Sequence, residues 1–263
     1  MEFVVLGSGS KGNCGFIRTD NTRLLIDNGF SGKEAVHRLE SVEQPADELD
    51  GIIVSHEHGD HIRGVGILAR KFKIPVYITE PTSKMVSKYL KHTELRYFSS
   101  GSEIRFHDLV IETVPLPHDA SDPVGFLLRS GTNGETGGRK LAYITDIGQP
   151  TTLVRERLAD VDALVIEANH DERMLMNGPY PWRTKQRIKS RFGHLSNSTS
   201  AGIIAEVVKS SGIRKVMLAH MSENNNDPEL ARDSIAQFVK ENCGVNISID
   251  VASQHTPAEI IEL

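Results

Sequence analysis

Short apolar runs separated by polar turns recur along the chain and predict a series of strands and helices. Residues 3–6 form an apolar strand that breaks at a glycine-rich turn, and two strand-like runs follow within residues 14–27. Ser31 and Glu34 then have the spacing of a capping box, so a helix is expected to begin there. The amino-terminal part is therefore predicted to be mainly β-structure.

The rest of the chain shifts toward alternation of strands and helices. Its apolar runs predict strands at 51–54, 76–79, 104–106, 109–114, 125–129, 141–145, 163–168, 215–219 and 247–251, with a polar loop at 131–140. Segments with helical spacing predict helices at 62–72, 82–90, 152–158, 198–210 and 228–241. Strands that cluster early and alternate with helices later indicate one α/β domain over residues 1–263, with mixed sheets.

The strand at 51–54 ends in a cluster of polar residues. His56, His58, Asp60 and His61 lie within six residues of one another. Imidazole nitrogens and carboxylate oxygens are ligands that zinc, manganese and iron accept. A solvated polar turn is the alternative, but packing gives no reason for three histidines and an aspartate at the end of an apolar strand. The cluster predicts a metal site.

Other predicted strands end in the same kinds of residue. His118, Asp146 and His220 each follow the end of an apolar strand. A single strand-end histidine is more often solvated than a ligand, but such residues converge where the carboxyl ends of strands meet. Together with the first cluster they make five histidines and two aspartates, which is enough for two cations.

The glycine-rich turn at residues 7–13 allows a second interpretation. Gly7 to Gly12 matches the G-x-G-x-x-G pattern of dinucleotide-binding folds. That pattern requires a helix directly afterwards, yet strand-like runs follow here, and the chain has no P-loop lysine pattern after these glycines. We therefore expect no nucleotide cofactor and interpret the turn as a tight loop that approaches the active site.

Composition narrows the cellular setting. With 263 residues, of which 38% are hydrophobic, the chain can bury a large core. Because the net charge is −5, nucleic-acid binding would need a local basic patch. Two cysteines cannot form a disulfide framework, and neither a signal-peptide pattern nor an apolar run of membrane-spanning length is present in the sequence. A cytoplasmic protein without a membrane partner is expected.

The order of the ligand-type residues resembles the metallo-β-lactamase superfamily over nearly the whole chain. The resemblance rests on His56-x-His58-x-Asp60-His61, with Asp27 before it and His118, Asp146 and His220 after it. It implies a four-layer αβ/βα sandwich of two mixed β-sheets flanked by helices. It also implies pseudo-symmetric halves at roughly 1–135 and 136–263, with a metal site along the shared edge of the sheets.

The resemblance further implies a role for each ligand-type residue. His56, His58 and His118 would hold one divalent metal ion, whereas Asp60, His61 and His220 would hold a second. Asp146 would bridge the two ions, and Asp27 would orient the ligands from behind, since metal-bound imidazoles need an acceptor on the far nitrogen. Nitrogen and oxygen ligands suit Zn, Mn or Fe, and we favour Mn or Zn.

Two features favour phosphodiester substrates. The first is the pair Glu167 and His194, which resembles the glutamate and histidine that nucleases of this superfamily place beside the metals. A Glu–His pair holds the imidazole in one tautomer and favours its charged form, so that His194 can assist the departing oxygen. The alternative is that His194 only caps the helix expected from residue 198.

The second feature is the basic run Arg183-x-Lys185-x-Arg187-x-Lys189-x-Arg191, beside Tyr180 and Trp182. Such a run can follow a nucleic-acid backbone, with an aromatic ring available for stacking. A solvated helix face explains the run equally well. Asn13 and Ser196 are further candidate donors to a phosphate group.

Within the superfamily, the motifs at 7–13, 145–148, 167–171, 193–197 and 220–225 are most similar to the compact YycJ/WalJ branch. This resemblance implies exonuclease activity on double-stranded DNA in the 5′ to 3′ direction. A hydroxide shared by the two metals would attack phosphorus, Asp60 would accept its proton, and His194 would assist the leaving group. The stretch between Asp146 and His220 is too short for an inserted β-CASP domain.

Three alternatives stay open at this point. An RNA-processing nuclease of the tRNase Z type would use the same metals on RNA. A small-molecule esterase or lactonase would also use them, but would ignore the basic run. A module that binds DNA without cleaving it would not need the full set of ligands.

Overall fold

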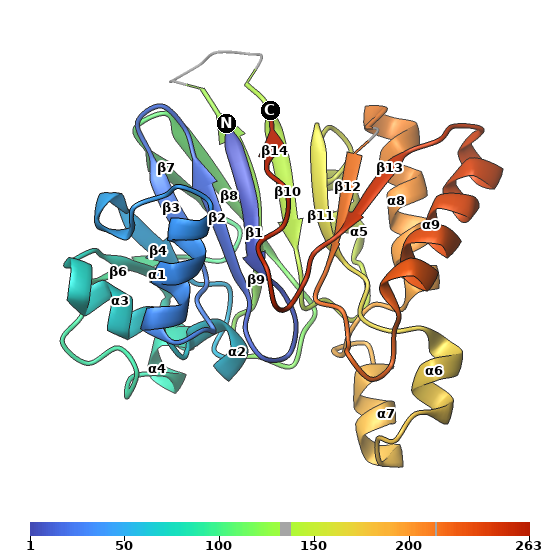
Figure 1. Cartoon of the computed structure of the whole chain (residues 1–263), viewed down its shortest axis with the longest axis horizontal. Helices are drawn as coiled ribbons and strands as arrows, with labels where there is room; N and C mark the ends of the chain where they lie inside the picture. The colour runs from blue at the N-terminus through green and yellow to red at the C-terminus, as the bar shows by residue number, and fades with distance from the viewer. Residues whose placement is uncertain (132–137, 214) are drawn as a thin grey trace.

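Two seven-stranded β-sheets face each other in the computed structural model of the chain (Figure 1). The structure describes residues 1–131, 138–213 and 215–263. In order across the first sheet are β14 (Ile261–Glu262), β1 (Glu2–Gly7), β2 (Cys14–Arg18), β3 (Arg23–Ile26), β4 (Gly51–Ile53), β5 (Val76–Thr79) and β6 (Leu95–Phe98). The second has β13 (Ser248–Val251), β12 (Lys215–Ala219), β11 (Ala163–Glu167), β10 (Lys140–Ile144), β9 (Val124–Ser130), β8 (Leu109–Pro115) and β7 (Glu103–Phe106).

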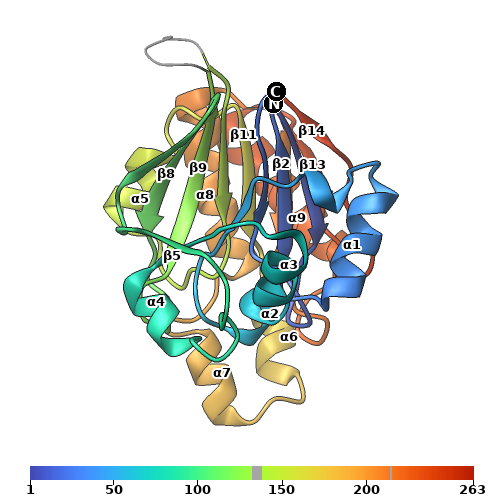
Figure 2. The ribbon, with the colours of Figure 1, turned by 90° about the vertical axis from the view of Figure 1, so that its left-hand side faces the viewer.

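Helices cover the outer faces of both sheets and complete four layers (Figures 1 and 2). Against the first sheet lie α1 (Gly32–Ser41) and α3 (Val65–Phe72), and against the second lie α5 (Thr152–Arg157), α8 (Asn197–Ser211) and α9 (Pro228–Cys243). The shorter helices are η1 (Ala46–Glu48), α2 (Gly59–Ile62), α4 (Glu80–Met85), α6 (Glu172–Asn177) and α7 (Trp182–Ile188). None of the helices in the described ranges is long and apolar enough to cross a bilayer. The predicted four-layer sandwich is confirmed.

The central strands of both sheets are apolar on both faces because both faces are buried. In β1, Phe3 and Val5 pack between the two sheets, whereas Val4 and Leu6 pack against the helices. The strand β10 divides its side chains in the same way. Successive side chains of a strand point to opposite faces, and each fully buried large apolar side chain stabilises the fold by about 1.5–3 kcal/mol. This double burial explains why the strands appear in the sequence as short continuous apolar runs.

Each sheet changes from antiparallel to parallel pairing at the same place. In the first sheet β14, β1, β2 and β3 pair antiparallel and β3 to β6 pair parallel. In the second, β7 to β10 pair antiparallel and β10 to β13 pair parallel. The chain passes from one sheet to the other between β6 and β7, so the expected halves, 1–135 and 136–263, do not coincide with the sheets. The mismatch arises because β7, β8 and β9 pair antiparallel in sequence order up to β10. They therefore belong to the second sheet, although they precede residue 136.

The structure corrects two of the predicted helices. The helix expected at 62–72 begins later, as α3, and a separate turn, α2, ends at Ile62. Gly64 lies between the two, where a Cβ atom would overlap the Phe30 carbonyl oxygen. The helix expected at 82–90 ends as α4 at Met85. The residues that follow form turns that close against α3, where Arg70 donates to the carbonyl oxygens of Tyr89 and Lys91 at 3.3 and 2.9 Å.

Several short elements were missing from the sequence-based prediction, among them η1, β14, β6, α6 and α7. The strand β6 lies at the edge of its sheet and leaves two of its four side chains exposed, so it lacks an apolar pattern. The helices α6 and α7 are short, with six and seven residues. Together they form the α6–α7 hairpin (residues 172–188), which projects beyond the ends of the layers (Figures 1 and 2). Of the polar loop expected at 131–140, residues 132–137 lie outside the described residues.

Replacing Gly64 with alanine is expected to lower the free energy of unfolding by about 2–3 kcal/mol, because the new methyl group must displace the Phe30 backbone. Gly202 is the matched control, since a Cβ atom there meets nothing within 4 Å and the residue lies inside α8. Gly202→Ala should be neutral or stabilise the protein by up to about 1 kcal/mol. Urea unfolding followed by circular dichroism measures both changes. Equal effects of the two substitutions would contradict the packing argument.

Candidate metal centre

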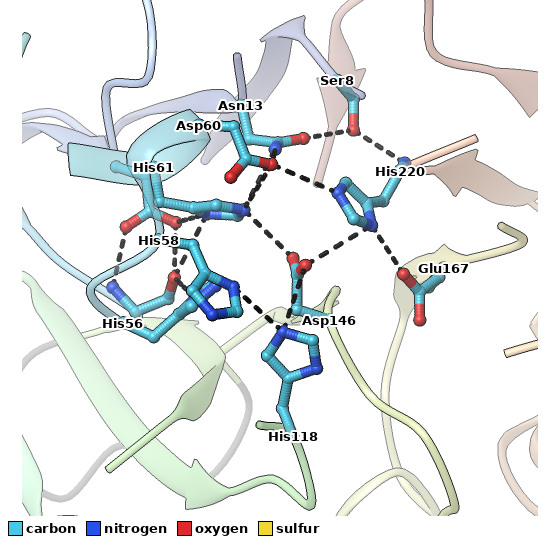
Figure 3. A network of polar contacts seen from close by, with 12 residues as sticks. Ser8, Asn13, His56, His58, Asp60, His61, His118, Asp146, Glu167 and His220 are labelled. Carbon is cyan, nitrogen blue, oxygen red and sulfur yellow. Dashed lines mark hydrogen bonds and ion pairs between the residues drawn. The ribbon is translucent and has the colours of Figure 1, made fainter. Parts of the chain in front are cut away.

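The ligand-type residues converge at the carboxyl ends of the central strands, and their side chains point toward one another (Figure 3). His56 comes shortly after β4, His118 after β8, Asp146 after β10 and His220 directly after β12. Asp60 and His61 lie in α2, the single turn of helix that follows the β4 end. Residues up to 164 positions apart in the sequence are thus gathered at one edge of the two sheets, as the strand-end pattern predicted.

Four overlapping groups of side chains in the described part of the chain could hold a metal ion, and two of them match the ligand sets that the resemblance implies. His56, His58 and His118 each offer a ligand atom within 4.8 Å of the others, and Asp60, His61 and His220 do the same. Between the groups, Asp146 places Oδ2 at 3.2 Å from His61 Nε2 and Oδ1 at 3.8 Å from His118 Nε2. These clusters are compatible with a dinuclear metal site.

Asp27 determines which nitrogen of two histidines faces the site. Its Oδ2 atom accepts a hydrogen bond from His61 Nδ1 at 2.8 Å and another from Ser55 Oγ at 2.6 Å. Since the Ser55 hydroxyl donates to Asp27, it accepts from His56 Nδ1, which lies 2.9 Å away. The Nε2 atoms of both rings are therefore left without a proton when the rings are neutral and can bind a cation. Ser55 transmits this constraint to His56, and it was not among the predicted site residues.

Glu167 has the corresponding role on the second sheet. Its Oε1 atom accepts from His220 Nδ1 at 2.6 Å and from His194 Nδ1 at 2.8 Å. Its Oε2 atom accepts from the backbone N–H groups of Ile147 and Leu195 at 3.2 and 3.0 Å. Burial would raise the pKa of this carboxyl, but the charges of both histidines and their hydrogen bonds lower it to about 2. Glu167 therefore stays ionised and holds two imidazoles, one more than the sequence predicted.

The remaining donor atoms also fit cations. His118 Nδ1 donates to the Gly193 carbonyl oxygen at 3.1 Å, which leaves Nε2 directed at the site. The Nε2 atom of His56 is buried and has no hydrogen-bond partner among the described residues. A buried polar atom without a partner is unfavourable by about 1–3 kcal/mol unless another ligand satisfies it. A divalent cation would satisfy this atom.

Four buried histidines of the site have shifted pKa values, two in each direction. Burial lowers the pKa of His56 and of His118, which favours the neutral imidazole that binds metals. Burial also opposes protonation of His61 and His220, but Asp146 and neighbouring carboxylates outweigh it and raise both pKa values well above 6.5. The carboxylates therefore attract positive charge to these two rings, which belong to the second ligand group.

Three site residues adopt the left-handed backbone conformation that non-glycine residues rarely occupy. The φ angles are 59° for Asp27, 57° for Asp146 and 50° for His220. Such a conformation is unfavourable by about 1–3 kcal/mol and persists only where the surroundings fix it. Here the Asp27 N–H donates to Ile53 O at 2.8 Å, and the His220 N–H donates to Ser8 Oγ at 2.7 Å. Strain of this kind is typical of functional sites.

The glycine-rich turn reaches the site, as its sequence suggested. Asn13 Nδ2 lies 3.2 Å from Asp60 Oδ2 and 3.0 Å from His61 Nε2, while its Oδ1 atom accepts from Ser8 Oγ at 3.1 Å. The Asn13 side chain is fully buried. A role for Asn13 in phosphate binding stays a prediction.

Ser196 has a structural role at the start of α8, where its hydroxyl accepts from the Thr199 N–H at 3.3 Å and so caps the helix. A role for Ser196 in phosphate binding stays a prediction. Because Ser196 is the capping residue, the alternative that His194 caps this helix is wrong. The side chain of His194 instead lies beside the rings of His118 and His220, each with a centroid distance of 5.1 Å.

A pocket of about 280 Å³ opens over the ligand groups. His58, Asp60, Asp146, His194 and His220 are among the residues that line it. The α6–α7 hairpin also contributes to the lining, through Tyr180, Thr184, Arg187 and Ile188. The ligand groups and a basic helix therefore share one cavity.

Because most of the basic run lies in the helix α7, its cations lie on different faces of that helix. Pocket-lining residues Thr184, Arg187 and Ile188 are three or four positions apart and so share one face of the helix. Arg183, Lys185 and Lys189 do not line the pocket, and Lys185 Nζ donates to the Met176 carbonyl oxygen at 2.7 Å. Trp182, at the start of α7, is 60% exposed and also lies outside the pocket. Residues at alternate positions cannot form one line on a helix, because each step of two turns the side chain by about 200°.

Comparison with known proteins agrees with this site. A family model described as the beta-lactamase superfamily domain matches residues 22–221. The chain belongs to the metallo-β-lactamase superfamily and is a metal-dependent hydrolase.

Individual relatives support the resemblance to the YycJ/WalJ branch. The chain is 38% identical over 244 residues to exodeoxyribonuclease YycJ of Bacillus anthracis, which covers 92% of this chain and 90% of that protein. It is 34% identical over 256 residues to exodeoxyribonuclease WalJ of Streptococcus pneumoniae, with 95% and 93% covered. The metallo-beta-lactamase fold protein YhfI from Bacillus subtilis superposes with a TM-score of 0.70 at 16% identity and covers 98% of both chains.

Glu167→Gln is expected to reduce the acid sensitivity of the metal-free protein. A pKa lowered from 4.5 to about 2 stabilises the fold above pH 4.5, and this contribution disappears as the pH falls toward 2. The difference in unfolding free energy between wild type and Glu167→Gln should therefore shrink by roughly 3 kcal/mol between pH 5 and 2. Urea unfolding in EDTA, followed by circular dichroism, measures this difference. A difference that does not change with pH would show that Glu167 is not paired as described.

Proposed function

We propose that this protein is a two-metal phosphodiesterase that degrades double-stranded DNA as a 5′ to 3′ exonuclease. The observation that carries the proposal is the 38% identity to exodeoxyribonuclease YycJ over 92% of the chain. The two groups of ligand atoms on either side of Asp146 support it, because phosphodiester cleavage commonly uses a pair of cations. We place the activity in the cytoplasm, where free cysteines such as Cys14 and Cys243 stay reduced.

Two divalent cations, Mn or Zn, would supply a water nucleophile at neutral pH and neutralise charge on the phosphate oxygens. His56, His58 and His118 would hold one of them, and Asp60, His61 and His220 the other, with Asp146 shared. Asp27, Ser55 and Glu167 would orient these ligands. Their hydrogen bonds keep the imidazole lone pairs directed at the site.

Two side chains would move protons. Burial would raise the pKa of Asp60, but the hydrogen bond with His220 and the nearby histidine charges lower it below its ordinary value. Asp60 is therefore ionised at neutral pH and can accept a proton from the attacking water. His194 donates Nδ1–H to Glu167, so its Nε2 atom is the one available to the oxygen that leaves phosphorus.

The basic run would attract the DNA. Arg183, Lys185, Arg187 and Lys189 lie on or directly after the α7 helix, which forms one wall of the pocket. The chain as a whole has a net charge of −5, so a concentration of cations beside the pocket would direct a polyanion to it. A panel of 5′-phosphorylated duplex DNA, single-stranded DNA and RNA, each with Mn or Zn, tests the substrate class. Cleavage of RNA alone would contradict the proposal.

Asp60→Ala is expected to remove one of the two bound metal ions and to abolish hydrolysis while the fold persists. The substitution takes a carboxylate from the second ligand group and leaves His56, His58 and His118 unchanged. Metal content by mass spectrometry, circular dichroism and cleavage of duplex DNA give the three readouts. Two retained ions with full turnover would count against a two-metal mechanism.

His194→Ala is expected to retain both ions and to lose roughly 10²–10⁴-fold in the rate of DNA cleavage, the usual range for general acid–base catalysis. His107→Ala is a matched control, because His107 is an exposed histidine in the β7–β8 turn, at the far end of β8 from His118. The rate and the metal content of the His107 variant should equal those of wild type. If His194→Ala cleaves DNA at the wild-type rate, His194 has only a structural role.

A further inference from the structure

Arg187 differs from the other cations of the basic run in its position. It is the only lysine or arginine among the described residues that line the pocket over the ligand groups. Its side chain is 51% exposed, so the guanidinium group is accessible to a ligand that enters from solvent.

An ion pair with Asp119 fixes the orientation of this guanidinium group. Arg187 Nε donates to Asp119 Oδ2 at 2.5 Å, and Nη2 donates to Oδ1 at 3.0 Å. This two-point contact uses two of the five N–H groups of arginine. The other three N–H groups of Arg187 have no acceptor among the described residues. A pair with side chains 51% and 35% exposed contributes little to stability, so orientation is its more important effect.

The pair is also fixed relative to the ligand groups. Asp119 directly follows His118, and its Oδ1 atom lies 3.4 Å from His118 Nε2. The Asp119 N–H donates to the Phe192 carbonyl oxygen at 3.1 Å, and His118 Nδ1 donates to that of Gly193 at 3.1 Å. The two adjacent residues that follow β8, His118 and Asp119, are thus hydrogen-bonded to two adjacent residues that follow α7. The guanidinium group therefore has a fixed place beside the cations that the site would hold.

A polynucleotide offers a ligand for such a group. Each scissile phosphodiester in a DNA strand has a neighbouring phosphate one nucleotide away, whereas a simple phosphodiester has none. A planar guanidinium group matches the oxygen atoms of phosphate, and a group that is already oriented loses less entropy on binding.

We propose that Arg187, held by Asp119, binds a second phosphate group of the substrate and so makes the site specific for polynucleotides over isolated phosphodiesters. This inference rests on the proposed function. The second phosphate belongs either to the DNA backbone or to a 5′ terminus, and both have the same chemistry. Arg187 contacts substrate in this proposal, whereas Asp119 is a positioning residue that acts through Arg187.

The test compares kcat/KM for a 5′-phosphorylated duplex, the same duplex with a 5′-hydroxyl group, and bis(p-nitrophenyl) phosphate, which has one phosphate. In Arg187→Ala, the ratio of duplex to bis(p-nitrophenyl) phosphate turnover should fall roughly 10- to 100-fold. The slope of log Kd for DNA against log salt should become shallower by about one unit. Asp119→Asn should raise KM for the duplex more than it lowers kcat, and Arg187→Lys should recover part of the Arg187→Ala loss.

Arg139→Ala is the matched control. Arg139 also pairs with an aspartate, Asp162, at 2.7 Å, but it precedes β10 and so lies at the opposite end of that strand from Asp146. Its substitution removes the same charge and should leave the ratio and the salt slope as in wild type. An Arg187→Ala loss on both duplexes assigns the backbone phosphate, and a loss on the 5′-phosphorylated duplex alone assigns the terminal phosphate; either result supports the proposal.

Two results would overturn the phosphate site while leaving the proposed function intact. One is wild-type turnover of both duplexes by Arg187→Ala, and the other is an equal loss on the duplexes and on bis(p-nitrophenyl) phosphate, which would indicate a general disturbance near His118. A wild-type protein that cleaves bis(p-nitrophenyl) phosphate but no DNA would overturn the proposed function itself, and the phosphate site with it.

Discussion

Buried carboxylates that receive imidazole N–H groups determine the geometry of the whole site. Asp27 and Glu167 are fully buried, and each fixes the tautomer of two histidines, Asp27 partly through Ser55. A buried charge is stable only when it is paired and hydrogen-bonded, so neither the carboxylates nor their partners can be replaced alone without a large penalty. Within each sheet these hydrogen bonds connect neighbouring strand ends, and contacts such as that between His61 Nε2 and Asp146 Oδ2 at 3.2 Å join the two sheets at the site.

The two sheets supply the same backbone feature and use it differently. Asp27 follows β3 and Asp146 follows β10, the strands at which pairing changes from antiparallel to parallel. Both have left-handed φ angles, of 59° and 57°. Yet Asp27 accepts the Nδ1–H of His61 behind the ligand groups, whereas Asp146 lies between the two groups. A repeated turn thus provides one carboxylate for orientation and one for the centre of the site.

The sequence predicted the parts of this protein that follow from local pattern and chemistry. Ligand-type residues at the ends of apolar strands identified the seven residues that the structure brings together, because strand ends meet at a common edge. It could not predict Ser55 or Asp119, whose roles depend on partners distant in the sequence, such as Asp27 and Arg187. The edge strand β6 and the short helices α6 and α7 bury too little to leave a periodic signal. The basic run was visible, but without the helix its cations could not be divided between pocket and exterior.

The chain has a single tryptophan, and Trp182 lies on the exposed surface of the α6–α7 hairpin. Because this indole ring is exposed to water, its emission in the folded protein reports on the hairpin and is insensitive to the packed interior of the sandwich. Local opening of the hairpin would change this emission while the circular dichroism of the sheets persists. The same property makes the native protein its own optical sensor for molecules that contact the outer surface of the hairpin, without an attached dye.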